Sequence, residues 1–286
     1  MAHEYVRKVA RNVPKCLNLK KMLMKKINVI ILLACSMGVV AQAQIIDTLV
    51  GRNTASGNLI GYTPYMVLEN SLGAGRGVIF PSGLTANYVG TGTTAEQALF
   101  LAPLNSFSTT YAVGDRLTVN VAMPVSSIAM DFGLAIAANN PIAASGPSYD
   151  SRSLFDWASI SVRPSQTSIR ANSSISGALV TGNGVLSAAP NTVSKLFIDW
   201  NSANLFTMGY IDTNSVVHVS ETISFSGAST IGADIGFYGD LRATGTSLGN
   251  FSNLAISTIP VPEPTSLAIC GLGGFLGLVG WMRRKK

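Results

Sequence analysis

One stretch of the chain has the spacing of a serine-hydrolase nucleophile. Residues 245–249 have the sequence Gly-Thr-Ser-Leu-Gly and match the G-x-S-x-G pattern, whose serine lies on a sharp turn between a strand and a helix. Such a serine needs an acidic residue and then a histidine later in the chain. After Ser247 the only acidic residue is Glu263, and no histidine follows. We therefore expect a glycine- and serine-rich turn here, without a nucleophile.

Carboxylates are the next candidates, because glycoside hydrolysis needs two of them about 5–9 Å apart, flanking one bond. Between residues 44 and 260 there are three glutamates, and none has the E-x-D-x-x-E spacing of sandwich glucanases: Glu69, Glu96 and Glu221. Asp131, Asp199 and Asp240 could converge in space, but we expect solvated aspartates at strand ends and turns. We predict no catalytic residue, and a divergent glycoside hydrolase or lyase is the least favoured alternative.

Metal-ligating side chains are equally sparse. His218 is the only histidine between residues 44 and 262, and we expect it on the surface or half-buried in a strand. Asp212 and Asn214 begin like a calcium loop but lack its later glycine and glutamate, so they predict a turn. We expect no cofactor and no side-chain metal site. A structural calcium ion held by backbone carbonyls stays open.

Aromatic side chains could bind sugars by stacking if their rings were exposed. Trp200 and Phe237 lie in alternating apolar runs, which favours the core. Tyr210 is a further aromatic in this region. Trp157 and Tyr238 are the two residues that we keep as candidate glycan-stacking platforms.

Charge and cysteine content point to the two ends of the chain rather than to its middle. The 286 residues have a formal net charge of +6, which by itself would suggest a nucleic acid or an anionic membrane as partner. Residues 44–262, however, hold eight basic residues against 12 acidic ones, a formal net charge of −4. All three cysteines, Cys16, Cys35 and Cys270, also lie outside this span. We therefore expect no nucleic-acid partner, no disulfide and no thiol chemistry.

The N-terminal region has the three parts of a secretory signal peptide. Two lysines at positions 25 and 26 precede an apolar stretch at 27–40, and Ala41, Gln42 and Ala43 form an A-x-A cleavage site. We predict a signal peptide at 24–43, export through the Sec translocon and a mature chain that begins at Gln44. Residues 1–23 are basic and without pattern, and we interpret them as an over-extended start.

The C-terminal region also has three parts. Val261, Pro262, Glu263 and Pro264 form an extended segment, because proline fixes φ near −65° and has no backbone N–H. Residues 265–282 carry no charge, and 18 residues make about 27 Å of helix, enough to cross a hydrocarbon core of about 30 Å. Four basic residues then end the chain as a cytoplasmic-side anchor: Arg283, Arg284, Lys285 and Lys286.

This tail resembles the PEP-CTERM sorting signal of Gram-negative bacteria. The resemblance implies recognition by an exosortase, a membrane-embedded cysteine protease or transpeptidase, and removal of the transmembrane helix at 265–282. It also implies an inner-membrane intermediate, then a place at the cell surface or outside the cell, often in an exopolysaccharide or biofilm matrix. The alternative is an ordinary C-terminal membrane anchor with a proline-rich stalk.

Residues 44–258 must then supply the exported domain, followed by the sorting signal at 259–286. This region is rich in Ser, Thr, Gly, Asn and Ala, and its short apolar runs alternate with turn residues, which predicts an antiparallel β-sandwich. The expected strands are 45–50, 65–69, 77–80, 116–123, 128–136, 158–163, 195–200, 205–211, 216–225, 233–238 and 251–256. Within them, 195–225 predicts a three-stranded meander, whereas the alanine-rich stretch 134–144 could carry a helical turn.

The last of these strands resemble the end of a concanavalin A-like, laminin G-like jelly roll. An Ile-Gly-Phe-Tyr strand at 235–238 is followed by Phe-Ser-Asn-Leu-Ala-Ile at 251–256. The resemblance implies a sandwich with a concave face that often serves carbohydrates or proteins. We therefore predict an exported structural or adhesive protein in an exopolysaccharide context, with a carbohydrate-binding module as the alternative.

Overall fold

The structure, a computed structural model, describes residues 43–52, 59–68, 86–89, 96–125, 131–138, 155–225, 231–240 and 247–260. The compact unit Gln42–Ile259 holds nearly all of them. The signal peptide expected at 24–43, apart from its last residue, lies outside the described residues, as do the sorting motif from Val261 and the span at 265–282. No helix among the residues described here combines the length and the apolar character that crossing a membrane requires.

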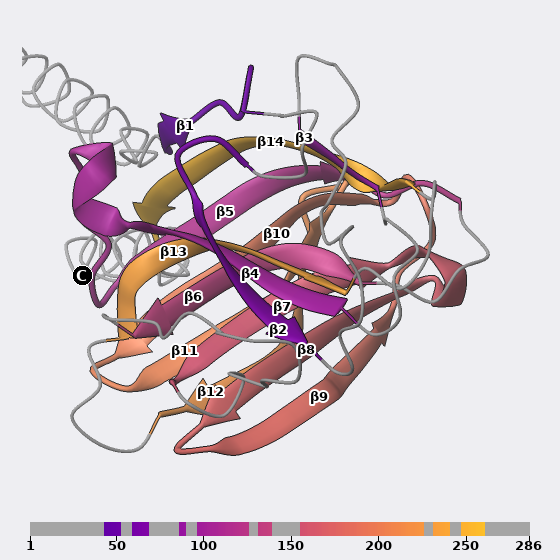
Figure 1. Cartoon of the computed structure of the whole chain (residues 1–286). Helices are drawn as coiled ribbons and strands as arrows, with labels where there is room; N and C mark the ends of the chain where they lie inside the picture. Colours follow the sequence, from indigo (N-terminus) through magenta and orange to yellow (C-terminus); the bar gives the residue numbers. More distant parts are fainter. Residues whose placement is uncertain are drawn as a thin grey trace, which may run out of the picture. The chain divides into compact units, whose positions relative to one another are not determined.

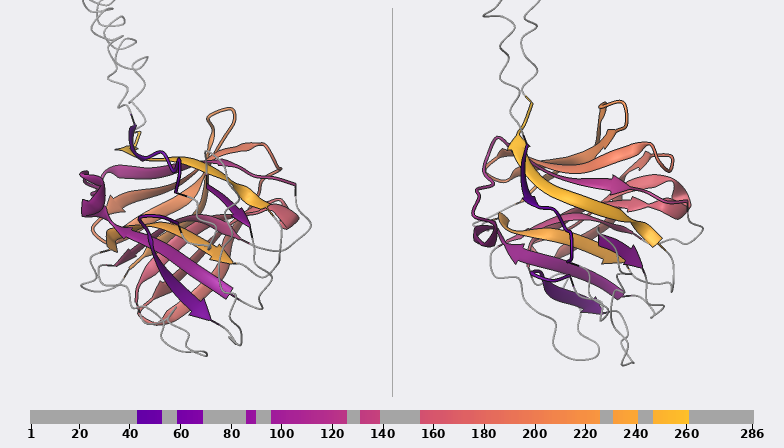
Figure 2. Two further views of the ribbon diagram at one scale, coloured as in Figure 1. Left: turned by 45° about the horizontal axis from the view of Figure 1, so that its top comes forward. Right: turned by 90° about the horizontal axis from the view of Figure 1, so that it is seen from above.

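The described strands form an all-β, two-sheet antiparallel sandwich, as predicted (Figures 1 and 2). The first sheet has the order β1 (Gln44–Asp47), β14 (Ser247–Thr258), β5 (Asp115–Ala122), β10 (Val193–Ser202), β11 (Leu205–Asp212) and β12 (Val217–Ser224), and β3 (Ala86–Val89) also pairs with β14. The second sheet has the order β2 (Thr63–Leu68), β4 (Glu96–Pro103), β13 (Ile231–Asp240), β6 (Phe132–Ala138), β7 (Trp157–Arg163), β8 (Ser168–Ile175) and β9 (Ala178–Ser187). The described part of the chain also contains two short 3-10 helices, η1 (Leu104–Phe107) and η2 (Pro164–Gln166).

The main core lies between the two sheets, where alternate residues of each strand meet. Aromatic rings connect the layers at its centre. The rings of Phe132 and Phe237 in the second sheet stack with 5.6 Å between their centroids. The Phe251 ring of the first sheet contacts Phe132 edge-on, with 4.5 Å between centroids. All three side chains are almost fully buried, so this contact fixes how the sheets face one another.

A second, smaller apolar cluster lies on the outer face of the second sheet, the face turned away from the first sheet. Along the strands of the second sheet, its members alternate with the residues that point into the main core. They are Leu99, Leu101, Ala135, Ala137, Phe155, Trp157 and Tyr238, with Tyr65 and Leu179 packed against them. We call this group the outer cluster.

The predicted meander at 195–225 is confirmed as β10, β11 and β12. Ser202 pairs with Leu205, so Ala203 and Asn204 make the first tight turn. The predicted turn after Asp212 leads into β12, where Val217 pairs back with Ile211. Apolar alternation and turn residues were sufficient to identify this unit.

One expectation on local structure was wrong. The alanine-rich stretch 134–144 was expected to allow a helical turn, yet residues 134–138 belong to the strand β6 (Phe132–Ala138), which overlaps the strand expected at 128–136; residues 139–144 lie outside the described part of the chain. All seven of its residues are buried, because one face meets the main core and the other meets the outer cluster. A strand buried on both faces loses its polar alternation, and small alanines fit on both sides. The predicted strand at 77–80 lies outside the described residues.

Several strands were not expected from the sequence: β3, β4, β8 and β9. The β8 strand hides its periodicity because both of its faces hold buried residues, and the outward-facing ones are polar. Ser168, Asn172 and Ser174 are each at most 3% exposed. Polar side chains at buried positions make a strand look like a loop.

Both ends of the domain lie in neighbouring strands. Gln44 at the start of β1 pairs with Ile256 near the end of β14, so the chain enters and leaves the sandwich on the same side (Figure 2). The Asp47 carboxylate then fastens β1 to the rest, because it accepts hydrogen bonds from the Leu49 amide at 2.8 Å and from the Tyr62 hydroxyl at 2.9 Å. Arg52 adds an ion pair at 3.2 Å.

Candidate functional site

A hollow lies where the outer face of the second sheet meets η1 and the chain after it. Its volume is about 810 Å³. Three parts of the fold contribute its walls: the strands β2, β4 and β13, the turn η1, and the segment between η1 and β5. The described lining residues are Tyr65, Pro103, Leu104, Asn105, Thr109, Thr110, Tyr111, Ala112, Ala233 and Asp234. We call this site the end hollow.

Asp234 supplies the charge in the end hollow. It lies near the start of β13, between Pro103 of β4 and Ala137 of β6. Ile235 and Phe237 of the same strand belong to the main core. Because successive side chains of a strand point to opposite faces, Asp234 points to the outer face of the second sheet. The residue is only 7% exposed, and burial raises the pKa of its carboxyl group above the ordinary value.

Two tyrosines line the end hollow together with this carboxylate. Burial and the negative charge of Asp234 both raise the pKa of Tyr65, so its hydroxyl stays neutral and can donate a hydrogen bond. Tyr111 is held more firmly. Its hydroxyl donates to the Ile198 carbonyl at 3.0 Å, and its ring packs against Trp200 with 5.3 Å between ring centroids. Burial raises the pKa of Tyr111 as well.

Amide and hydroxyl groups come from η1 and the segment after it. Asn105, Thr109 and Thr110 contribute them, and Asn105 and Thr110 are exposed. Asp115 at the start of β5 fixes the far end of this segment, because its carboxylate accepts a hydrogen bond from the Ala112 amide at 3.0 Å. The polar groups therefore sit on a loop that is anchored at both ends.

This arrangement is suited to binding a ligand with many hydroxyl groups. A carboxylate and a side-chain amide can accept and donate several hydrogen bonds, and the half-buried Tyr65 ring offers an apolar face to a sugar ring, whereas Tyr111 is buried in the main core. Of the described residues that line the end hollow, Asp234 alone carries a carboxyl group. The pair of carboxyl groups that glycoside hydrolysis uses is therefore not formed by these residues.

The two predicted glycan-stacking residues are buried, which corrects their proposed exposure. Trp157 is 0% exposed and Tyr238 is 2% exposed, and their rings stack on each other with 5.4 Å between centroids. In the structure both belong to the outer cluster, on the face of the second sheet that also carries the end hollow. Tyr65 packs against the same outer cluster, so the two rings support a wall of the hollow from behind.

The expectation that Phe237 and Trp200 belong to the core is confirmed. Phe237 is 1% exposed and belongs to the main core, and Trp200 packs against that core, as predicted. Tyr210 is 6% exposed and is also a core residue. Sequence reasoning missed Tyr65 and Tyr111, because neither has a sequence context that distinguishes it.

Asp131 and Asp199 do not converge. Asp199 lies in the first sheet and forms a two-pronged ion pair with Arg116, with distances of 2.6 and 2.7 Å. Asp131 precedes β6 in the second sheet and lies 3.6 Å from Arg163. Asp240 ends β13, and its side chain lies outside the description. A turn was expected at 245–249, but Ser247 begins the strand β14, and residues 245 and 246 lie outside the described part of the chain.

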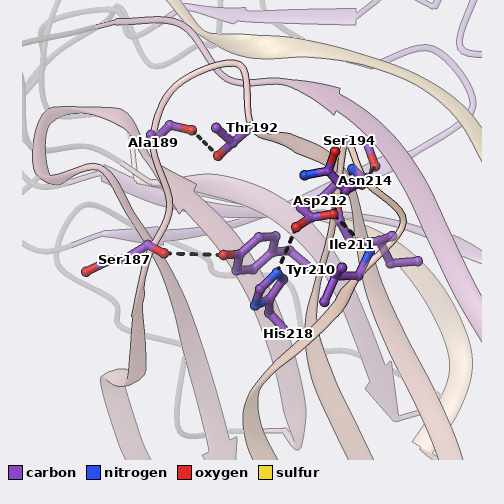
Figure 3. A network of polar contacts seen from close by, with 10 residues as sticks. Ser187, Ala189, Thr192, Ser194, Tyr210, Ile211, Asp212, Asn214 and His218 are labelled. Atoms are coloured by element: carbon purple, nitrogen blue, oxygen red, sulfur yellow. Dashed lines mark hydrogen bonds and ion pairs between the residues drawn. The ribbon is translucent and has the colours of Figure 1, made fainter.

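His218 belongs to a polar network at the turn where β11 ends and β12 begins (Figure 3). Its Nε2 atom lies 3.1 Å from an oxygen of Asp212, and its ring stacks on Tyr210 with 4.4 Å between centroids. The other Asp212 oxygen accepts the amides of Asn214 and Val216, both at 2.8 Å. The predicted turn is thus confirmed, with the Asp212 carboxylate used to hold its backbone. Within the described ranges, no three His, Cys, Asp or Glu side chains gather as a metal site.

Comparison with protein families concerns the tail alone. Residues 260–285 match the PEP-CTERM protein-sorting motif. The chain carries a PEP-CTERM sorting signal. This signal implies an exported protein that an exosortase processes and that reaches the cell surface of a Gram-negative bacterium. The resemblance drawn from the Pro-Glu-Pro segment and the basic terminus is therefore confirmed.

The β-sandwich of this PEP-CTERM protein is similar to several solved structures. With the exoplasmic/lumenal domain of VIP36 in its Ca²⁺/Man3GlcNAc-bound form, the TM-score is 0.45 at 9% identity, over 78% of this chain and 93% of that one. With the Emp47p carbohydrate recognition domain it is 0.41 at 9% identity, over 76% and 96%. With a protein of unknown function from Shewanella oneidensis MR-1 it is 0.40 at 14% identity, over 69% and 78%.

These similarities describe the arrangement of two sheets and nothing finer. A comparison with curated proteins gives no match. The function must therefore be argued from the end hollow and the sorting signal of this chain.

Proposed function

We propose that this exosortase-sorted protein is a non-enzymatic adhesive protein whose β-sandwich binds polysaccharide in the end hollow. The exopolysaccharide around the cell is its partner, and the protein acts at the surface or in the matrix. On its way it passes through an inner-membrane intermediate that is cut near Pro262–Pro264.

The composition and position of the end hollow carry this proposal. A volume of about 810 Å³ accommodates several sugar rings, and the described walls combine a carboxylate, an amide, hydroxyls and tyrosine rings. Such a mixture of apolar faces and few polar groups is typical of small-molecule sites. The hollow is open enough for a chain to pass along it, since Asn105 and Thr110 at its rim are exposed.

The absence of catalysis is supported by the same walls. Asp234 is the one carboxylate among the described lining residues, and neither His218 nor Asp212 lines the hollow. A purely structural protein without a glycan ligand is the second candidate. It is favoured by the plain composition of the domain, and it predicts no binding to any polysaccharide.

Binding by a side-chain variant separates these two candidates. Asn105→Ala removes an exposed amide at the rim without disturbing a buried contact, and we expect about two- to tenfold weaker binding to a polysaccharide, the value of one hydrogen bond. Asn250→Ala, an exposed asparagine of β14, is the matched control and should bind as the wild type does. Affinity electrophoresis against a panel of neutral, amino and acidic polysaccharides is the measurement. Binding to none of them would exclude the glycan-binding function.

A further inference from the structure

Asp234 is a buried carboxylate that no cation among the described residues compensates. It is 7% exposed, and within the described part of the chain burial is the one effect that shifts its pKa, with no hydrogen bond or charged partner contributing. Its described companions in the end hollow include no lysine, arginine or histidine. By contrast, the equally buried Asp199 has Arg116 as a two-pronged partner.

An unpaired buried charge is costly unless a partner of opposite sign reaches it. Asp234 lines an open hollow, so a ligand can supply that partner where the protein does not. We propose that the end hollow selects amino sugars with a free amine, whose ammonium group pairs with the Asp234 carboxylate. This inference rests on the proposed glycan-binding function and names the class of glycan.

Tyr65 strengthens the case for a cation. It lines the same hollow as Asp234, whose negative charge contributes to its raised pKa, so a ligand in the hollow meets both side chains. Tyrosine ring faces attract ammonium groups within about 6 Å. Asp234 and Tyr65 therefore favour the same positive charge, and the neutral Tyr65 hydroxyl can accept a hydrogen bond from it.

The same electrostatics disfavour two other classes of glycan. A uronic acid would bring a second carboxylate next to Asp234, with no described cation in the walls to offset the repulsion. An N-acetylated sugar can still accept and donate hydrogen bonds but carries no charge, so its contact with Asp234 is a weaker one. The net charge of −4 over residues 44–262 acts in the same direction.

Binding should depend on pH in a defined way. The titratable groups that the described walls present are Asp234, Tyr65 and Tyr111, from β13, β2 and the segment before β5. Burial raises the pKa of both tyrosines, so both stay neutral across the acid and neutral range. Binding of the ammonium needs the ionised carboxylate, so affinity should fall as the pH drops through the raised pKa of Asp234.

The test compares three hexasaccharides by isothermal titration calorimetry with the purified full chain. They are a glucosamine hexasaccharide, its fully N-acetylated form and a uronic acid hexasaccharide. We expect the glucosamine form to bind at least about tenfold more tightly than the acetylated form, the difference between a charged and a neutral hydrogen-bond pair. In Asp234→Asn this preference should shrink to about twofold or less. Glu221→Gln, which removes a carboxylate from β12 in the other sheet, should keep it.

Three outcomes are distinguishable. Preference for the amine that disappears in Asp234→Asn and persists in Glu221→Gln supports the inference. Equal binding of the amino and acetylated forms, or tighter binding of the uronic acid, overturns it while glycan binding stands. Failure of all three to bind overturns the proposed function. Asp234→Asn is nearly isosteric, and an unchanged thermal transition in its circular dichroism spectrum, or a higher one, shows that the variant is folded.

Discussion

At the scale of single residues, two buried aspartates show how the fold treats a carboxylate in opposite ways. Asp199 is 5% exposed and is held by two short hydrogen bonds from Arg116, whose guanidinium also lies 4.4 Å from the centre of the Phe197 ring. Asp234 is 7% exposed and has no such partner among the described residues. The first carboxylate serves the fold, and the second is available to a ligand.

Replacing Asp234 by asparagine should stabilise the free protein. Its raised pKa means that the folded state favours the neutral carboxyl, so its contribution to stability is present below the ordinary pKa of about 3.9 and is lost as the pH rises through the raised value. At pH 7 we expect a gain of about 1 kcal/mol, which is about 2–4 °C in Tm for a domain of this size. Thermal unfolding of Asp234→Asn and of wild type at pH 7 and pH 4 measures it.

The gain should be smaller at pH 4, because part of the wild-type population is then neutral at this position. A Tm that falls at pH 7 would mean that the Asp234 carboxylate is stabilised by the fold, contrary to its lack of a described partner.

Replacing Asp199 should have the opposite effect. Asp199→Ala leaves the buried Arg116 guanidinium without its carboxylate, and breaking a buried pair in this way costs about 3–5 kcal/mol. Urea denaturation monitored by tryptophan fluorescence gives the free energy of unfolding. The double variant Arg116→Met with Asp199→Leu should recover much of the loss, because it removes both charges. A loss below about 1 kcal/mol in the single variant would contradict a buried, mutually dependent pair.

At the scale of elements, the hairpin between β11 and β12 depends on one side chain. The Asp212 carboxylate accepts the amides of Asn214 and Val216 and meets the His218 ring (Figure 3). The bond from Val216 and then the contact with His218 lower the pKa of Asp212. The turn chemistry was visible in the sequence, whereas the role of His218 came from the cross-strand pairing of Tyr210 with His218.

Removing this carboxylate should loosen the turn without unfolding the sheet. In Asp212→Ala we expect the amides of Asn214 and Val216 to lose their hydrogen-exchange protection. In wild type, the lowered pKa means that the stabilisation is present above the ordinary pKa and is lost as the pH falls through the lowered value. Amide exchange measured by NMR at several pH values reports both effects. Asn214→Ala keeps the acceptor and is the control, and equal loss of protection there would contradict the role of Asp212.

Strands whose buried side chains are apolar could be predicted. Leu196 and Ile198 face the main core, and the turn residues at 201–204 follow them, so β10 and its meander were found. The strand expected at 128–136 likewise overlaps β6, whose seven residues are all buried. In β8, buried Asn172 and Ser174 take the place of apolar residues, and this strand was not expected. Polar residues at buried positions remove the apolar pattern from which a strand is recognised.

At the scale of the whole molecule, the sorting signal and the sandwich have separate tasks. Residues 260–285 match the sorting motif, and the strands that begin and end the domain lie side by side, since Gln44 pairs with Ile256. Thr109, which lines the end hollow, hydrogen-bonds to Gln44 at 3.4 Å, so the hollow lies near the start of the domain.

Processing at both ends should be visible in one mass measurement. We expect protein isolated from its native host to begin near Gln44 and to lack the residues after about 265. The physical reason is that the signal peptide and the apolar span serve membrane passage, and the exported product has no further use for either. Intact mass spectrometry of the purified protein is the measurement. A product that retains Arg283, Arg284, Lys285 and Lys286 would contradict cleavage by an exosortase.

The sequence by itself determined the route and the class of fold. The Pro-Glu-Pro segment, the apolar run and the basic end act locally, through proline geometry, helix length and charge, so they need no tertiary contact to be recognised. Alternation and turn residues likewise determined an antiparallel sandwich. Asp234, Tyr65 and Asn105 come from three separate segments, and only the tertiary structure brings them to one hollow. Whether a ring such as Trp157 is exposed depends on what packs against it, and that information lies in the fold.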